Sequence, residues 1–280
     1  MSAPPDFALR LTGYDAIRLT GSDASAFLNG QVSAEVAAIP EGRIGLAAWC
    51  TPKGRVDFLF RVAPGKDALW LIVRADALER CVTRLKMFVL RAEVTVAGPA
   101  DHGRSVYFLG DDGDTADSAS DGFIDVDGRR SLHFADPATG AADGQRRFDL
   151  ADVAATIPVF GEALAGAFLP QALNLEALEG LSYRKGCYPG QEVIARLHFR
   201  GENKRALATL AGTGSGTPPS PGARLRDPAA PTGAGCGVVT WAGRLAEGGL
   251  IAQAVVERDA PAELVTEQGD AFRVENTTFA

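Results

Sequence analysis

The pattern of apolar residues changes near Gly201, and this change constrains the fold more than any other feature of the sequence. Before Gly201, runs with β-strand character alternate with runs of helical period, which is typical of mixed α and β structure. After it, short apolar runs follow one another at 205–210, 238–241, 250–257 and 272–279, and residues 212–221 are rich in Gly, Ser, Thr and Pro. We therefore predict an α+β part followed by a small antiparallel β-barrel or sandwich.

The first part contains one strong β-hairpin signal. Apolar runs at 46–49 and 56–62 flank Thr51-Pro52-Lys53-Gly54, whose Pro and Gly favour a tight turn. The other expected elements follow from apolar spacing. They are a helix that starts after Ser22-Asp23 and ends before Pro40, strands at 68–73, 92–96, 106–109, 123–126 and 131–134, an amphipathic helix at 76–90, and irregular helical structure at 149–200.

Charge and composition exclude several classes of protein. With 28 basic and 35 acidic side chains the net charge is −7, whereas a nucleic-acid-binding protein presents a basic face. No apolar run approaches the ~20 residues that span a membrane, and the N-terminus does not resemble a secretory signal. The four cysteines and three histidines are scattered, so we expect a cytoplasmic protein without disulfides or a metal site.

Three segments partly resemble known ligand-binding motifs but lack residues that these motifs require. The acidic stretch at 111–121 lacks the alternating spacing and final Glu of an EF-hand, so we predict a surface loop. The glycine-rich segments at 212–216 and 233–237 lack the third glycine of a dinucleotide-binding fingerprint, and neither stands between a strand and a helix. We predict turns at both.

One loop combines the residues that activate a thiol. Residues 184–192 read Arg-Lys-Gly-Cys-Tyr-Pro-Gly-Gln-Glu, and the glycines and proline place Cys187 in a tight loop. If residues 191–196 begin a helix, its free N–H groups and positive dipole end point towards this loop. Arg184 and Lys185 add positive charge, and each of these features favours the thiolate. The alternative is an ordinary core cysteine beside a turn.

The motif Lys-Gly-Cys-Tyr-x-Gly-Gln-Glu at 185–192 resembles the signature of the YgfZ family of folate-binding proteins. This family is related to the T-protein (aminomethyltransferase) of the glycine cleavage system. Four further segments resemble the family: 21–31 with its Gly-x-Asp-Ala and Phe-Leu-x-Gly-Gln motifs, the hairpin turn at 50–55, the stretch at 168–175 and the stretch at 200–205. The resemblance therefore extends over most of the first ~205 residues.

The resemblance implies three domains arranged in a ring around a central channel for folate. Two are α+β modules, one of them inserted in the other, and the third is a C-terminal antiparallel β-barrel. We accordingly predict an α+β protein with a discontinuous domain of residues 1–48 and 148–200, which carries the cysteine loop. The inserted α+β domain would comprise residues 49–147, and the barrel domain residues 201–280.

The resemblance further implies a tetrahydrofolate-binding accessory protein that supports the assembly or repair of iron–sulfur enzymes. Its partners would be iron–sulfur enzymes or assembly factors, and its cofactor tetrahydrofolate or a one-carbon derivative. Cys187 would be the reactive group, as a transient ligand, a redox group or a nucleophile, and whether the chain is an enzyme stays open. The rest of this site would be Lys185, Tyr188, Gln191 and Glu192, where Glu192 either opposes the thiolate or caps the next helix.

Folate contacts are predicted from motif position and ligand chemistry. Folates carry an anionic glutamate tail and amide-like edges on the pterin, so Arg, Lys, Gln and Asn suit their channel. Lys53 and Arg55 in the hairpin turn would meet the carboxylate tail. Ordinary surface or capping roles are the alternative for every candidate. The full set is Gln31, Lys53, Arg55, Gln171, Asn174 and Arg196.

Two other functions compete with this prediction. T-protein-like one-carbon (aminomethyl) transferases carry adjacent acidic residues in the strand after the hairpin turn. Here that strand reads Arg-Val-Asp-Phe-Leu at 55–59, with Asp57 as its one acid, which argues against aminomethyl transfer. The third possibility is a non-catalytic folate-binding interaction module, and the intact cysteine motif argues against it.

Lysine usage singles out one position in the motif. Lysine occurs only at 53, 66, 86, 185 and 204, and the first, fourth and fifth of these lie in segments that resemble the family. A compact ammonium and a planar guanidinium are not interchangeable at a tight site. We therefore predict that Arg cannot replace Lys185.

Overall fold

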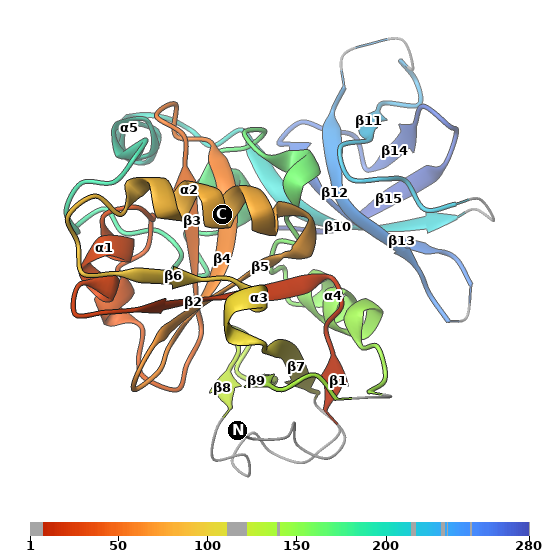
Figure 1. Cartoon of the computed structure of the whole chain (residues 1–280). Coiled ribbons are helices and arrows are strands. Elements are labelled where there is room, and N and C mark those ends of the chain that lie inside the picture. The colour runs from red at the N-terminus through yellow and green to blue at the C-terminus, as the bar shows by residue number, and fades with distance from the viewer. Residues whose placement is uncertain are drawn as a thin grey trace.

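Two open sheets and a closed barrel, all antiparallel, form the framework of the protein (Figure 1). The computed structural model describes residues 8–110, 122–138, 141–213, 217–230, 233, 235–246 and 248–279. The mixed α and β architecture with a C-terminal antiparallel barrel confirms the predicted fold class. The acidic stretch at 111–121 lies outside the described residues.

The first sheet has five strands and is covered on one face by helices. Its strands in spatial order are β3 (Gly45–Cys50), β4 (Val56–Pro64), β5 (Leu69–Arg74), β2 (Tyr14–Thr20) and β6 (Thr95–Ala97). The helix α1 (Ala24–Asn29) and the helix α2 (Leu78–Phe88), which follows a 3-10 turn at Ala75–Ala77, pack on this face. The hairpin β3–β4 and the helix α2 confirm the elements predicted at 46–62 and 76–90.

The helix predicted before Pro40 is wrong in its length. The helix α1 ends at Asn29, and a separate 3-10 turn covers Val36–Ala38. Gly30 follows α1, and beyond it the chain turns to the edge strand, where Val32 forms an antiparallel bridge with Trp49. The apolar residues after Gly30 are buried through contact with β3 and not through helical periodicity, which is why their spacing misled the sequence analysis.

The second sheet packs against the opposite face of the first. Its strands in spatial order are β1 (Leu9–Arg10), β7 (Ser105–Leu109), β9 (Ser131–Ala135) and β8 (Phe123–Ile124). The short helix α3 (Pro99–His102) precedes β7, and α4 (Gln145–Ala154) follows the sheet. Side chains along β2 alternate between the two cores: Ile17 and Leu19 face α2, whereas Tyr14 and Ala16 face the second sheet.

The C-terminal barrel closes with six strands. In spatial order they are β10 (Arg205–Thr213), β13 (Leu250–Glu257), β12 (Gly237–Arg244), β11 (Arg224–Arg226), β14 (Glu263–Thr266) and β15 (Ala271–Thr277). The sequence analysis found four of these strands and missed β11 and β14, which have three and four residues. Strands this short carry too few alternating positions to give a pattern.

Residues 155–204 connect the first part to the barrel through a core of their own. This segment contains the 3-10 turns Glu162–Leu164 and Pro170–Leu173 and the helix α5 (Gln191–Arg200). Its core takes Leu46, Cys50 and Leu59 from the hairpin and Leu207 and Val255 from the barrel. The hairpin and the barrel are therefore packed against the same apolar cluster.

The domain bounds stay a prediction. The predicted boundary between residues 48 and 49 falls inside β3, which pairs with β4 along its whole length. The six barrel strands all lie within the predicted segment 201–280.

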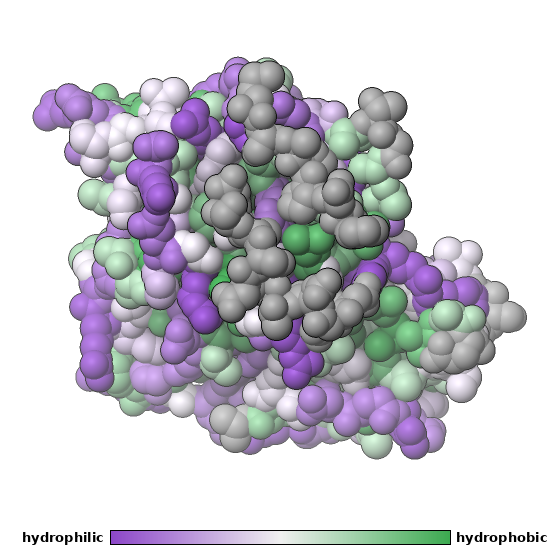
Figure 2. All heavy atoms as spheres, turned by 90° about the horizontal axis from the view of Figure 1, so that it is seen from below, coloured by the Kyte–Doolittle hydropathy of each residue, from purple (hydrophilic) through white to green (hydrophobic). Residues whose placement is uncertain are grey.

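The described surface combines polar and apolar residues. Seen from below (Figure 2), hydrophilic residues predominate along the left and lower edges of the molecule, with hydrophobic residues interspersed. Within the described ranges, no helix has both the length and the apolar character needed to cross a membrane.

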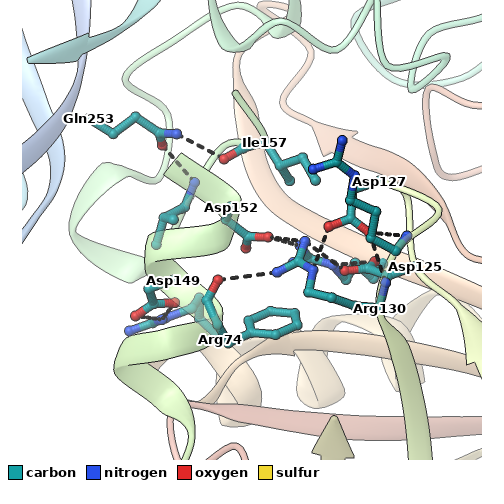
Figure 3. A network of polar contacts seen from close by, with 12 residues as sticks. Arg74, Asp125, Asp127, Arg130, Asp149, Asp152, Ile157 and Gln253 are labelled. Atoms are coloured by element: carbon teal, nitrogen blue, oxygen red, sulfur yellow. Dashed lines mark hydrogen bonds and ion pairs between the residues drawn. The ribbon is translucent and has the colours of Figure 1, made fainter. Parts of the chain in front are cut away.

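A buried cluster of charged side chains lies where the two sheets and α4 meet (Figure 3). Arg61 of β4 donates from Nε to Asp125 at 2.9 Å and from Nη2 to Asp152 at 2.6 Å. Arg130 donates to Asp152 at 2.8 Å and to Asp127 at 2.6 Å. Both arginines are less than 5% exposed, and both guanidinium groups lie over the Phe148 ring.

Neighbouring hydrogen bonds link α4, and the residues that follow it, to the barrel. Asp149 accepts hydrogen bonds from Arg74 at 3.1 Å and from the indole of Trp241 at 3.1 Å. Gln253 of β13 donates to the carbonyl of Ile157 at 2.8 Å and accepts from the N–H of Val159 at 2.8 Å. The barrel is thus oriented by directional bonds as well as by apolar contact.

The charge balance of the cluster makes its protonation depend on pH. Three carboxylates, on Asp125, Asp127 and Asp152, share the two guanidinium groups of Arg61 and Arg130. Burial raises the pKa of Asp152 to about 6, although Arg61 and Arg130 favour its ionised form. One bound proton would make the cluster neutral.

Asp152→Asn should therefore change how stability depends on pH. The pKa of about 6 in the folded state lies above the ~3.9 of an unfolded aspartate, so the folded state binds more protons between these values. The contribution of this carboxyl to the free energy of unfolding then falls as the pH rises through that window. We expect the stability of Asp152→Asn relative to wild type to rise by about 2 kcal/mol from pH 4 to pH 7.

Urea unfolding at several pH values measures this effect. The exposed Asp259→Asn is the control for the loss of a carboxylate at the surface. A difference between Asp152→Asn and wild type that stays constant from pH 4 to pH 7 would contradict the prediction.

Candidate functional site

The cysteine loop precedes a helix and holds its thiol in solvent. Cys187 is exposed, whereas Cys50 and Cys81 are buried, so the alternative of an ordinary core cysteine is wrong. Gly190 precedes α5 with a φ of 81°, and the helix starts at Gln191 as predicted. The free N–H groups of the first turn of α5 therefore belong to the same short segment as the thiol.

Lys185 has a different role from the one predicted. Its Nζ donates to the carbonyl oxygens of Asn29, Val32 and Ala34 at 2.5, 2.7 and 2.6 Å, and its side chain is 9% exposed. All three ammonium donors are used by these carbonyls, so the residue clamps the loop instead of offering a free charge to Cys187. Burial lowers the pKa of Lys185 to about 8, and Glu35 opposes this shift.

The same geometry agrees with the expectation that arginine cannot replace Lys185. Three carbonyl oxygens surround one nitrogen, which suits a tetrahedral ammonium. A guanidinium spreads its donors over a flat fork and needs more room.

Ser33 is a second anchor of the loop that the sequence analysis missed. Its hydroxyl donates to the carbonyl of Gly180 at 2.6 Å and accepts from the N–H of Ala48 in β3 at 2.9 Å. Its carbonyl accepts from the N–H of Ser182 at 2.9 Å. Nothing in the sequence marks Ser33, because its partners lie far away along the chain.

The remaining motif residues differ in exposure. Tyr188 is 6% exposed, its ring lies 5.3 Å from the Lys185 Nζ, and burial raises its pKa. Gln191 is half-buried, and Glu192 is an exposed acidic residue in the first turn of α5. A carboxylate there is favourable next to the positive end of the helix dipole. The residue before the helix is Gly190, so α5 has no side-chain cap.

The hairpin turn packs directly on the cysteine loop. A Cβ on Gly190 would lie 2.5 Å from the carbonyl oxygen of Thr51 and 2.6 Å from the Cα of Gly54. A Cβ on Gly54, whose φ is 74°, would lie 3.0 Å from the Cβ of Val193 in α5. Two glycines thus allow the two turns to touch backbone to backbone.

Several predicted ligand contacts have internal partners. Gln171 donates to the carbonyl of Ile194 in α5 at 2.8 Å, and Asn174 donates to the carbonyl of Thr156 at 3.1 Å. Arg55 donates to the carbonyl of Ala167. Lys53 and Arg196 are exposed, and Gln31 is half-buried.

The structure brings together the segments that resemble one family. The 29–34 segment reaches the cysteine loop through Lys185, and the 51–54 turn reaches it through Gly190. The 170–173 turn contacts the following helix α5 through Gln171. These segments are more than 150 residues apart at the extremes, as shown by the 156-residue separation of Lys185 and Asn29. The result is one corner of the molecule built around an exposed thiol.

Asp57 contacts arginines of α2. Strand β4 has a register shift opposite Trp49 and Cys50, and Asp57 is the extra residue at this bulge. Its carboxylate pairs with Arg80 at 2.9 Å and also with Arg84, and Asp57 is 8% exposed. Arg61, four residues further along β4, contacts Asp152 of α4. Asp57 is therefore neutralised on the α2 side of the sheet.

A cavity of about 500 Å³ lies between the second sheet and α4, away from the predicted contacts. Phe108 and the alanines of α4 supply its apolar walls, and its charged lining residues are Asp127, Arg129, Arg130 and Arg147, of which Arg130 is paired with Asp127. None of the predicted site residues lines it. The sequence analysis missed these residues because they are spread from 108 to 155 and share no motif.

Comparison with known proteins shows the class of fold. No protein-family model matches the chain. The structure is similar to the crystal structure of glycine cleavage system aminomethyltransferase T from Bartonella henselae, with a TM-score of 0.70 and 16% sequence identity over 96% of this chain and 84% of that chain. The protein therefore has a T-protein-like fold, and the resemblance to the YgfZ family stays a prediction.

Two glycines of the loop should respond very differently to substitution. Gly190→Ala forces a Cβ into the backbone of the hairpin turn at a positive φ, whereas a Cβ on Gly186 meets nothing within 4 Å. We expect Gly190→Ala to cost at least about 2 kcal/mol of stability and Gly186→Ala less than about 1 kcal/mol. Urea unfolding of both variants tests this, and equal losses would show that the turns do not touch.

Proposed function

We propose that this protein is a YgfZ-like, tetrahydrofolate-binding accessory protein that supports the assembly or repair of iron–sulfur enzymes in the cytoplasm. The observation that carries the proposal is the convergence of the motif segments on the exposed Cys187. A fixed loop with its thiol in solvent suits transfer chemistry with a second protein. Iron–sulfur enzymes or their assembly factors are the partners we propose.

The surroundings of Cys187 support a reactive thiol. The helix α5 begins four residues after it, and the exposed Arg184 precedes it by three residues. A transient thiolate contact, a redox event and a covalent step all use the same exposed sulfur.

Folate binding is supported by the fold and by the chemistry of one cavity. Its volume of about 500 Å³ lies within the range of small-molecule sites. Phe108 would contact the aromatic part of the ligand, and Arg129 and Arg147 would pair with its carboxylate tail. Bound tetrahydrofolate would supply a carrier for one-carbon units. The motif-derived contacts Gln171 and Asn174 are less suited as hydrogen-bond donors to a ligand, because their NH2 groups already bind backbone carbonyls.

Aminomethyl transfer is the less favoured function. The acid of the strand after the hairpin turn, Asp57, is held by Arg80 and Arg84 on the α2 side of the sheet. A carboxylate with two guanidinium partners is a poor acceptor for a reacting amine. The non-catalytic interaction module is less favoured because Lys185 and Ser33 fix an exposed thiol in place.

Cys187→Ser tests the role of the thiol. In cells that lack the native protein, we expect wild type to restore the activity of iron–sulfur enzymes and Cys187→Ser to restore less than about a tenth of it, because a hydroxyl is neither a thiolate ligand nor redox-active. Cys236→Ser in the barrel is the matched control and should rescue as wild type does. Full rescue by Cys187→Ser would remove the thiol from the mechanism.

The affinity of variants for tetrahydrofolate tests whether folate binds in the cavity lined by Arg129. Loss of a charge-assisted bond to the carboxylate tail predicts a roughly tenfold weaker Kd for tetrahydrofolate in Arg129→Ala. Arg196→Ala, at a motif-derived position on α5, should bind as wild type does. Isothermal titration measures both. Weakening in Arg196→Ala alone would place folate at the cysteine loop, and no saturable binding by wild type would overturn the cofactor assignment.

A further inference from the structure

Among the described residues, the large exposed apolar side chains all lie on α2, just after it, or on α5. Met87 and Phe88 at the end of α2 are 67% and 42% exposed, and Leu90 just beyond it is 86% exposed. On α5, Val193 and Phe199 are 40% and 70% exposed. Isolated exposed apolar residues are ordinary, but their restriction to these two places marks a surface.

Both helices flank the end of the hairpin that supports the cysteine loop. The ring of Phe88 packs edge-on against Trp49 of β3 at 5.3 Å, and the guanidinium of Arg84 lies over the same indole at 5.2 Å. On the other side, Val193 of α5 packs on Gly54 in the hairpin turn. Figure 1 shows α5 and the end of α2 on the side of the molecule away from the barrel.

The same segments carry an excess of positive charge. Within 51–55, 84–90 and 184–200, one acidic residue is present, the exposed Glu192. The whole chain has a net charge of −7, so the positive charge here is a local feature. The exposed basic side chains of these segments are Lys53, Arg55, Lys86, Arg184, Arg196 and Arg200.

We propose that this surface, which we call the cysteine face, docks a protein with an acidic surface and so delivers it to Cys187. The cysteine face comprises the exposed residues of 51–55, 84–90 and 184–200. Basic side chains would steer an acidic partner, and Met87, Leu90, Val193 and Phe199 would give it an apolar contact. The proposal rests on the proposed function in taking Cys187 as the reactive group.

Charge-matched peptides test the docking independently of folate and iron. Three peptides of equal length carry one cysteine as its mixed disulfide with thionitrobenzoate, flanked by Leu and by Glu, Lys or Ser. The Cys187 thiolate attacks the peptide sulfur, a mixed disulfide forms and coloured thionitrobenzoate leaves. We expect the Glu peptide to react about tenfold faster than the Lys peptide at low salt, with the ratio approaching one at high salt.

Variants locate the effect on the cysteine face. The triple reversal Lys53→Glu, Arg184→Glu and Arg196→Glu should invert the preference, and Met87→Ser with Leu90→Ser should slow the Glu peptide about threefold. Lys66→Glu is the control and should leave the preference for the Glu peptide unchanged. Lys66 is an exposed lysine in the turn after β4, outside the cysteine face, whereas Lys53 lies in the turn before β4. Cys187→Ser should abolish the release of thionitrobenzoate.

Three results would overturn the proposal. They are equal rates for the Glu and Lys peptides with wild type, an unchanged preference in the triple reversal, and a dimer in sedimentation that Met87→Ser with Leu90→Ser dissociates. The last result would show that a second copy of this chain covers the face. None of them bears on rescue by Cys187→Ser, so failure of the docking surface and failure of the proposed function can be told apart.

Discussion

The buried pairing of Arg61 and Arg130 with three aspartates is the constraint on which the rest of the structure depends. These groups come from β4, from the turn between β8 and β9 and from α4, so the two sheets and the helix can meet only in the arrangement that pairs the charges. Removing either arginine would leave carboxylates without a partner charge in the interior, which is far more costly than losing an exposed ion pair. Asp149, bonded to Trp241, extends this arrangement towards the barrel.

Strand β4 connects this charged cluster to the cysteine loop and so fixes the position of the loop. The strand that contributes Arg61 to the charged cluster begins at the turn on which Gly190 rests, and it also supplies Leu59 to the core shared with the barrel. The thiol is exposed, yet the backbone around it is fixed by Lys185, Ser33 and the hairpin turn. A surface group with so many internal anchors combines access with a defined geometry, which a mobile loop would not give.

Local patterns predicted much of the fold, and non-local contacts account for most of what they missed. The hairpin, the helix α2 and four barrel strands follow from apolar spacing and turn residues, and the motif at 185–192 predicted the loop with the exposed cysteine as the candidate site. The partners of Lys185, the bulge at Asp57 and the cavity at Arg129 were not predictable. The bulge lies within one hairpin, but no residue pattern marks it. The partners of Lys185 and the cavity depend on contacts between residues that are distant in sequence, and single-sequence patterns carry no such information. The overextended helix before Pro40 has the same origin, because β3 and not a helix buries Val32.

The clamp formed by Lys185 has a consequence for synthesis. The carbonyl groups of Asn29, Val32 and Ala34 that accept from Lys185 are synthesised about 150 residues before the lysine itself. They therefore lack this donor while the intervening chain is being made. The clamp can form only after Lys185 has been synthesised, which is after the hairpin, the second sheet and α4 have been synthesised. A chain that ends before Lys185 therefore lacks the three hydrogen bonds that fix the loop around Cys187.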